Sequence, residues 1–552
     1  MKYRVLLSGA IGVAVAGAPA LADDLTISTS TTAAVATATA ANSTPGNITI
    51  SNAGSVALTA TGVAVSLNSN NSVSNSGTIS NNADSSAVGV QISGSNTGSF
   101  TNAGIINILG TAKPSTAGGQ FGVLLNGTGA FTGNIVATSV SSITVTGVSA
   151  NAVAVETELN GNLTLGGSVT ASGSASNGVI TSGLIDGAFT NTGMITTTRQ
   201  ATETTVNPGS AVAIGANIAG GFLNAGPITS TDTTAVGIIS TVGTSPALIV
   251  APSIGLDASN IALGVLSDVN TPGYSLVNRG KITSTGDRPS TSATTIQIGD
   301  ASDNTSGKLT GFSGGFYNSG AITAVATSDL ANTASLASNA TAIIIANGAT
   351  VPLLTNAATG TISATTGGEL GGNTVAVSIQ SGGSLTTLNN AGTIASSANL
   401  TATAVTSLTA YAIQDASGKL TQITNSGTIS ATTTVLNNGA QKAVAADLSL
   451  ATTAINFTNS GTVTGDILFG KGAGSQLTIE GAHAVVAGNI QAVGTGVVNI
   501  AVSAGGTGGT LQSSHVTGVG TLTVGPQGTL NLGIGANNPV VSATGAISFD
   551  AL

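Results

Sequence analysis

Apolar and polar positions follow one short pattern that returns many times along the chain. Copies read FTNSGTVT from Phe457, ITNSGTIS from Ile423, FYNSGAIT from Phe316 and FTNTGMIT from Phe189. In each copy an apolar residue comes two positions before Asn, Gly comes two positions after it, and Ile or Val follows. Because Asn and Gly both tolerate a positive φ, the pattern predicts a sharp turn between two short strands. A recurring unit of this kind is typical of a repeat architecture.

The asparagine of each copy marks the predicted turn. These turn residues are Asn52, Asn75, Asn102, Asn191, Asn224, Asn278, Asn318, Asn356, Asn390, Asn425 and Asn459. Two intervals between them are long, and degenerate copies beginning at Phe131, Leu163 and Ile249 are expected to divide these intervals. With that division, residues 23–465 consist of units that are mostly 23–40 residues long.

A second apolar segment lies upstream of most turns. Examples are GVAVSL from Gly62, TVAVSI from Thr374 and AYAIQD from Ala410, in which Val or Ile recurs at every second position. That period predicts strands with one buried face. A unit this short buries its apolar face only by stacking on its neighbours. The sequence therefore predicts an all-β, right-handed parallel β-helix, with handedness taken from the general preference of parallel crossovers.

Stacking also explains which residues recur. In a parallel stack the same position returns at about 4.8 Å along the axis, so each turn asparagine can bond to the next and form a ladder. The phenylalanines two positions earlier would form an apolar column. We expect the asparagines, glycines and phenylalanines to have structural roles and not to bind a ligand.

The first 22 residues have the features of a secretory signal peptide. Lys2 and Arg4 precede an apolar segment, and Ala20-Leu21-Ala22 gives a small-x-small cleavage site after Ala22. Loss of these two basic residues changes the net charge from −9 to −11. An acidic chain of this kind argues against nucleic acid or anionic lipid as a partner. The absence of cysteine is consistent with an exported protein that folds without disulfides.

After Gly465 the pattern changes. Residues 466–552 contain shorter, glycine-paced segments without the Asn-x-Gly turn, and we interpret them as a continuing β-solenoid or a terminal cap. No stretch of 18 consecutive apolar residues follows the signal peptide, so no membrane insertion of this segment is expected.

Candidate chemistry is sparse, because charged residues make up only 6% of the chain. Glu480 and His483 lie too far from other ligand types to form a metal motif. Asp300, Asp303 and Asn304 have oxygen ligands suitable for calcium, but an acidic surface loop is the simpler interpretation. Arg279 and Lys281 occupy variable turn positions and are expected to be solvated. We therefore predict no enzyme activity, no metal and no cofactor.

The signal peptide, the F-T-N-S-G-T-I units and the run GDILFGKGAGSQLTIEGA followed by GTLTVGPQGTLNL together resemble the passenger domains of Gram-negative autotransporters. The resemblance implies a β-helix at the cell surface, outer membrane or outside the cell, acting in adhesion, aggregation or biofilm formation on carbohydrate or on a host or neighbouring cell. It also implies an outer-membrane translocator barrel in cis as a partner. The ~10-residue alternating strands of such a barrel are not found here. We expect this chain to be a passenger fragment of a longer protein or the product of a truncated frame, in preference to secretion by another route. Alternatives are a stalk for an effector domain outside this chain and a self-assembling surface-layer protein.

Overall fold

The structure is a computed structural model, and it describes residues 24–83, 86–109, 119–199, 207–227, 235–255, 260–288, 291–300, 307–328, 338–368, 372–399, 407–434, 440–533 and 540–549. The predicted signal peptide and its cleavage site at Ala22 lie outside these residues, as do Asp303 and Asn304.

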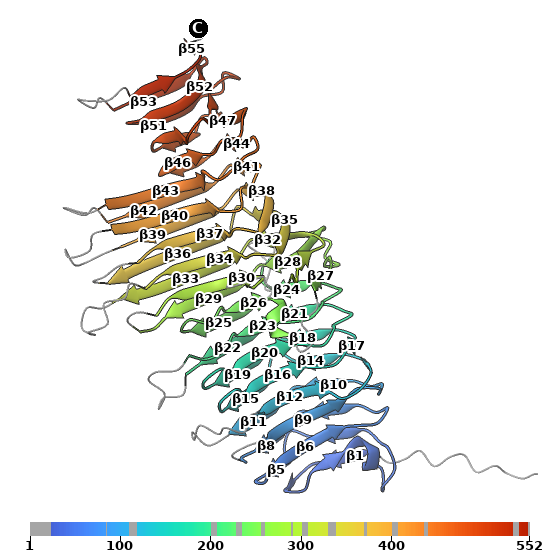
Figure 1. Cartoon of the computed structure of the whole chain (residues 1–552). Coiled ribbons are helices and arrows are strands. Elements are labelled where there is room, and N and C mark those ends of the chain that lie inside the picture. The colour runs from blue at the N-terminus through green and yellow to red at the C-terminus, as the bar shows by residue number, and fades with distance from the viewer. Residues whose placement is uncertain are drawn as a thin grey trace, which may run out of the picture.

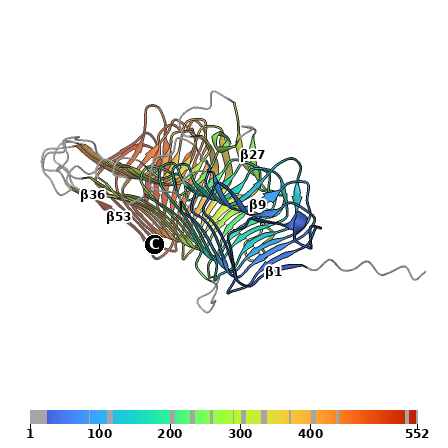
Figure 2. The ribbon, with the colours of Figure 1, turned by 90° about the horizontal axis from the view of Figure 1, so that it is seen from below.

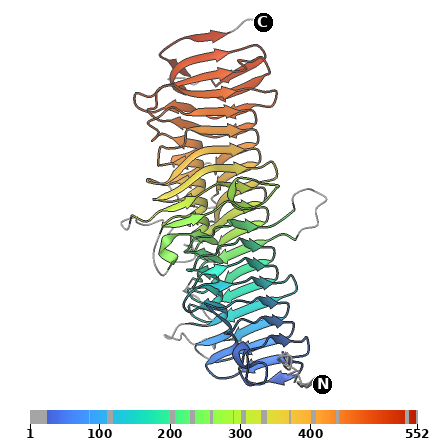
Figure 3. The same ribbon diagram turned by 90° about the vertical axis from the view of Figure 1, so that its right-hand side faces the viewer.

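The chain forms a rod of stacked coils in which neighbouring strands run parallel (Figure 1). Each coil contributes one strand to each of three long sheets, here called sheets I, II and III. The N-terminal coils lie at one end of the rod and the C-terminal coils at the other (Figure 3). The stack confirms the predicted all-β, parallel β-helix fold.

Sheet I contains the asparagine turns at the ends of its strands. Its strands are β1 (Leu25–Ile27), β4 (Ile48–Ile50), β7 (Val73–Asn75), β10 (Phe100–Asn102), β14 (Ile135–Ala137), β18 (Leu163–Leu165), β21 (Phe189–Asn191), β24 (Phe222–Asn224), β28 (Tyr274–Asn278), β32 (Gly315–Asn318), β35 (Ala349–Asn356), β38 (Ser384–Asn390), β41 (Gln422–Asn425), β44 (Asn456–Asn459), β47 (Ser475–Ile479), β50 (Val498–Val502), the second half of β52 (Val516–Val524) and β55 (Ile547–Phe549).

Sheet II follows the turns and lines one side of the stack when the rod is seen from below (Figure 2). Its strands are β2 (Ser30–Thr31), β5 (Ser55–Leu58), β8 (Thr78–Asn81), β11 (Ile105–Leu109), β15 (Ser142–Thr146), β19 (Ser168–Ser172), β22 (Met194–Thr198), β25 (Ile238–Val242), β29 (Lys281–Gly286), β33 (Ala321–Ser328), β36 (Thr361–Gly368), β39 (Thr393–Ala398), β42 (Thr428–Thr433), β45 (Thr462–Thr464), β48 (Val485–Ala487), β51 (Gly509–Ser513) and β53 (Gly528–Leu532).

Sheet III holds most of the upstream Val/Ile segments. Its strands are β3 (Val35–Ala36), β6 (Gly62–Leu67), β9 (Ala87–Ser93), β12 (Phe121–Asn126), β16 (Asn151–Val155), β20 (Asn177–Thr181), β23 (Val212–Ile214), β26 (Leu248–Val250), β30 (Ala293–Ile298), β34 (Ala340–Ile345), β37 (Thr374–Ile379), β40 (Ser407–Asp415), β43 (Ala440–Leu448), β46 (Asp466–Phe469), β49 (Ile490–Ala492), the first half of β52 and β54 (Val541–Ala543).

Shorter elements lie between sheets III and I. Strands β13 (Phe131–Thr132) and β17 (Leu159–Asn160) pair with each other, and β27 (Ile261–Leu263) pairs with β31 (Thr310–Phe312). Single bridges through Ile185 and Ile218 connect these two pairs. Two 3₁₀ turns complete the described elements, η1 (Thr37–Thr39) and η2 (Pro252–Ile254).

One continuous apolar core runs inside the rod from Ile27 to Val524. The phenylalanines two positions before the asparagines lie in it, and Phe100, Phe189, Phe222, Phe316 and Phe457 are at most 1% exposed. The rings of Phe189 and Phe222, on consecutive coils, meet edge to face with their centroids 4.9 Å apart. Stacking therefore buries side chains that a single coil would leave in water.

Coil length varies more than the sequence suggests. Asn224 pairs directly with Asn278, so the 53 residues between them belong to one enlarged coil. The segment beginning at Ile249 belongs to strand β26 in sheet III of that coil, and the prediction that it starts a separate unit is wrong. By contrast, β14 and β18 do divide the interval between Asn102 and Asn191. The copy at Leu163 has the predicted frame, whereas the frame predicted from Phe131 is wrong, because Phe131 lies in β13 and Ile135 pairs with Phe100 in sheet I. With 17 strands in sheet II, the rod is about 77 Å long at about 4.8 Å per coil.

The stack continues into the C-terminal segment without a break. Strand β48 follows β45 in sheet II after only 23 residues, as Thr462 pairs with Val485. At the register position of the turn asparagines, these coils have Ile479, Val502 and Val524. The change in pattern after Gly465 is therefore a change in coil size and in the residue that faces the core, within one continuous fold.

Candidate functional site

A ladder of asparagine side chains runs along the inside of sheet I. In each step the Nδ2 of one asparagine donates a hydrogen bond of 2.7–2.8 Å to the Oδ1 of the asparagine in the next coil. The bonds run from Asn75 to Asn102, from Asn191 to Asn224, and then in turn to Asn278, Asn318, Asn356, Asn390, Asn425 and Asn459. These side chains are at most 2% exposed. Except for the Nδ2 of Asn102, these buried amides have hydrogen-bond partners, as the energetics of a buried polar group require.

Several of these amides also support the turn that follows them. Asn390 Nδ2 donates to the carbonyl of Gly392 in its own turn at 3.2 Å and to the carbonyl of Thr428 in the next coil at 3.0 Å. Because the same side chain connects its own turn to the next coil, the ladder fixes the register of sheets I and II together.

Asn52 does not belong to this ladder. Ile50 faces Asn75 in the register of sheet I, while Asn52 lies exposed in the turn two residues later. The first turn is longer by two residues, since Ser55 pairs with Thr78 while Ile50 pairs with Asn75. The sequence pattern alone is compatible with either Ile50 or Asn52 at the ladder position. The structure therefore places ten of the eleven predicted turn asparagines in the ladder and excludes Asn52.

The turn glycines have a different role from the one expected. Gly392, Gly427 and Gly461 have no positive φ. Instead, a Cβ on Gly427 would lie 2.1 Å from the carbonyl oxygen of Gly392, and a Cβ on Gly461 would lie 2.1 Å from that of Gly427. Close stacking of successive turns, and not left-handed backbone geometry, requires glycine here.

The ladder is interrupted in two coils. Ala137 and Leu165 occupy its position between Asn102 and Asn191. As a result, the Nδ2 of Asn102 is buried without a hydrogen-bond partner. The turn after Ala137 is also longer by two residues, since Asn102 pairs with Ala137 while Ile105 pairs with Ser142, and Val140 within it is 77% exposed.

Outside the ladder, the described residues form a groove on the outer surface of sheet I with a volume of about 640 Å³. Thr190 of β21 and Leu223 of β24 form its floor, and the loop from Leu266 to Val269 forms one wall. Asn162, the segment from Asp186 to Ala188, Gly220 and Arg279 line the remainder. The loop exists because the coil between Asn224 and Asn278 is enlarged.

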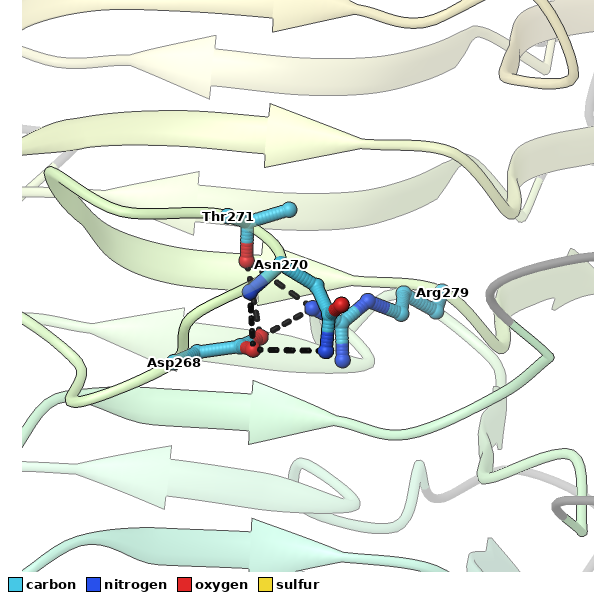
Figure 4. Close-up of polar contacts among 4 residues, drawn as sticks. All are labelled: Asp268, Asn270, Thr271 and Arg279. Carbon is cyan, nitrogen blue, oxygen red and sulfur yellow. Dashed lines mark hydrogen bonds and ion pairs between the residues drawn. The ribbon is translucent and has the colours of Figure 1, made fainter.

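An ion pair holds the loop in place (Figure 4). Arg279, after β28, pairs with Asp268, and the two side chains are 7% and 12% exposed. The carboxylate of Asp268 also accepts hydrogen bonds from the backbone amide of Asn270 at 2.9 Å, from its Nδ2 at 3.4 Å and from the Thr271 hydroxyl at 2.8 Å. Arg279 also donates to the Thr271 hydroxyl at 2.9 Å. The expectation that Arg279 is solvated is therefore wrong, whereas Lys281 is exposed.

The ion pair between Asp268 and Arg279, here called the clamp, is electrostatically suited to hold the loop. Burial would raise the pKa of Asp268, but hydrogen bonds from Asn270, Thr271 and Arg279 and the charge of Arg279 hold that pKa below its ordinary value. The carboxylate therefore stays ionised at neutral pH and keeps its partners. Sequence reasoning missed Asp268 because a single acidic residue in a variable loop carries no pattern.

The other predicted candidates lie apart from the groove. Glu480 accepts hydrogen bonds from the amides of Gly505 and Thr507, both at 3.0 Å. Burial would raise its pKa, and the contacts with Thr507 and Gly505 lower it below the ordinary value. His483 is exposed, and Asp300 bonds to Ser253. Within the described part of the chain, no three His, Cys, Asp or Glu side chains are placed to hold a metal ion.

The fold and the ladder define a parallel β-solenoid repeat protein with a groove on its flank. No family model, curated protein or solved structure is significantly similar to the chain. No helix among the described residues is long and apolar enough to cross a membrane.

Proposed function

We propose that this chain is a non-catalytic passenger of the autotransporter type, presented on the surface of a Gram-negative cell or released from it. There it acts in adhesion, aggregation or biofilm formation. The translocator that carries it through the outer membrane is a β-barrel in cis. The proposal rests on the signal-peptide pattern, on the resemblance of the repeats and on the shape of the molecule. A rod about 77 Å long that is anchored at one end presents an extended surface away from the cell.

The observation that carries the adhesive part of the proposal is the outer surface of sheet II. Its central outward column holds, in register from coil to coil, Thr144, Thr170, Thr196, Ser240, Thr283, Thr323, Ser363, Ser430 and Thr464, and Ala395 interrupts it between Ser363 and Ser430. These residues are half-buried and uncharged. A long array of hydroxyl groups favours contact with neutral, hydroxyl-rich surfaces such as polysaccharide.

A deletion strain tests this function. We expect intact wild-type cells to lose the protein on brief treatment with an external protease, and the deletion strain to aggregate and attach less than the wild type. Complementation with the complete gene restores both properties. A protein that is protected from protease on intact cells, or a surface-exposed protein whose deletion leaves aggregation and attachment unchanged, contradicts the proposal.

A further inference from the structure

The groove beside the Asp268–Arg279 clamp has the dimensions of a ligand site. Its volume of about 640 Å³ lies within the range of about 300–1,000 Å³ that is usual for small-ligand pockets. It extends along the rod from the turn before β18 to the residue after β28. Four consecutive strands of sheet I span about 14 Å, which suits an elongated ligand.

The walls of the groove differ in chemistry. Asp186, which is exposed, Asn162 and Thr190 provide hydrogen-bonding groups. Leu223, Leu266 and Val269 provide an apolar surface. Val269 is 92% exposed, more than any other large apolar residue in the described part of the chain. A ligand that fits has both polar edges and an apolar face.

Charge narrows the class of ligand further. Arg279 is already paired with Asp268, so the only carboxylate left to a ligand is that of Asp186. The charged residues of the groove lining are Asp186, Asp268 and Arg279, which leave one net negative charge. Anionic ligands, including phosphates and acidic sugars, are therefore disfavoured.

The backbone around the groove is already occupied, which disfavours an extended peptide. The amides of Asp186 and Gly187 donate to the carbonyls of Leu159 and Gly161 at 2.9 and 3.1 Å, and the amide of Ala188 donates to Asn162 Oδ1 at 2.9 Å. The strands of the floor are interior strands of sheet I, paired on both sides. Recognition by addition of a strand needs a free edge, and none is present in this wall.

We infer that this groove binds a short segment of a neutral polysaccharide, with sugar hydroxyls on Asp186, Asn162 and Thr190 and the C–H face of a ring on Leu223 and Val269. The clamp pre-forms the apolar wall, which reduces the ordering cost of binding. The inference deepens the proposed adhesive function by assigning its target class to one site.

Binding is tested with the purified protein and four probes: cellotetraose, chitotetraose, tetragalacturonate and tetralysine. Titration calorimetry and ligand-observed NMR give the affinities. We expect one or both neutral tetrasaccharides to bind, and the anionic and cationic probes not to bind. Binding of tetralysine alone, of tetragalacturonate alone, or of no probe overturns the inference.

Two variants locate the site. Thr190→Trp fills the floor of the groove and is expected to weaken binding by at least about tenfold. Asp186→Asn removes the carboxylate, and because Asp186 is exposed this substitution is expected to leave the fold intact. Thr424→Trp is the matched control, because Thr424 has the same outward register position in β41, outside the groove. Equal binding by the wild type, Thr190→Trp and Asp186→Asn overturns the inference. This outcome is separate from the cell assay, since purified protein can bind sugar whether or not deletion changes attachment.

Discussion

The asparagine ladder predicts that a single amide in the middle of the rod contributes strongly to stability. Replacing Asn390 by Ala removes the acceptor of Asn356 Nδ2 and the donor to Asn425 Oδ1, both at 2.7 Å. It also removes the bonds to the carbonyls of Gly392 and Thr428. The loss of two ladder bonds at about 1 kcal/mol each, with a further penalty for the buried oxygen of Asn425, gives a destabilisation of about 3 kcal/mol.

Denaturant unfolding followed by far-UV circular dichroism measures this loss. Hydrogen exchange of the amides in β35, β38 and β41 shows whether it is local, as expected for an array whose coils contact only their neighbours. Asn52→Ala is the matched control, because Asn52 is exposed and outside the ladder. The control is expected to change stability by less than about 0.5 kcal/mol. If Asn390→Ala costs no more than Asn52→Ala, the ladder does not stabilise the rod and the reasoning fails.

Four further predictions follow from the ladder, the turns and the clamp. Asn102→Ala should lower the free energy of unfolding by about half as much as Asn390→Ala, since only one ladder bond is lost and the Nδ2 of Asn102 is already without a partner. Equal losses of stability in denaturant unfolding contradict this prediction. Gly427→Ala should destabilise the protein by about 3 kcal/mol, because the new Cβ overlaps with the Gly392 carbonyl. Gly311→Ala is the control and should be nearly neutral, because its Cβ would have no neighbour closer than 4.0 Å. Equal melting temperatures of the two variants argue against close stacking of the turns. The lowered pKa of Asp268 means that the clamp contributes fully above the ordinary aspartate pKa of about 3.9 and is lost as the pH falls through the lowered folded value. The protection of amides in the 266–273 loop, expressed relative to the intrinsic exchange rate at each pH, should therefore fall in acid in the wild type and be low at both pH values in Asp268→Asn. A wild-type loop with the same protection factors in acid as at neutral pH refutes the clamp. The intact mass of the native product in outer-membrane fractions should exceed the mass of this chain by the mass of a translocator barrel. If the product has the length of this chain and is found free in the culture supernatant, with no larger species in the membrane, the autotransporter proposal is contradicted.

The sequence is sufficient for the parts of the fold that repeat. Period-two alternation identifies the strands, and recurrence of Asn with an apolar residue two positions earlier identifies sheet I and its ladder. These features can be recognised in the sequence because each coil packs against a coil of similar sequence, so the same physical requirement selects the same type of residue in many coils. Phe189 and Phe222 show this directly, as the same core position is occupied by the same residue in neighbouring coils.

Features that occur once could not be predicted in this way. The frame at Asn52 is ambiguous because Ile50 and Asn52 both match part of the pattern, and only pairing with the next coil decides between them. The enlarged coil before Asn278 has no internal repeat, so its length resembles two units. The clamp between Asp268 and Arg279 depends on how that coil folds over sheet I, which local sequence does not specify.

The direction of the ladder gives the rod a polarity beyond that of its backbone. In every ladder bond the donor belongs to the coil nearer the N-terminus and the acceptor to the coil nearer the C-terminus. The side-chain dipoles are therefore aligned, and each bond strengthens the next by polarisation. At its N-terminal side the ladder presents an oxygen, and at its C-terminal side Asn459 presents an N–H group, which donates to the carbonyl of Val485. The two ends of the amide column therefore differ chemically, so the C-terminal coils continue the rod by accepting from an N–H group and not by donating to an oxygen.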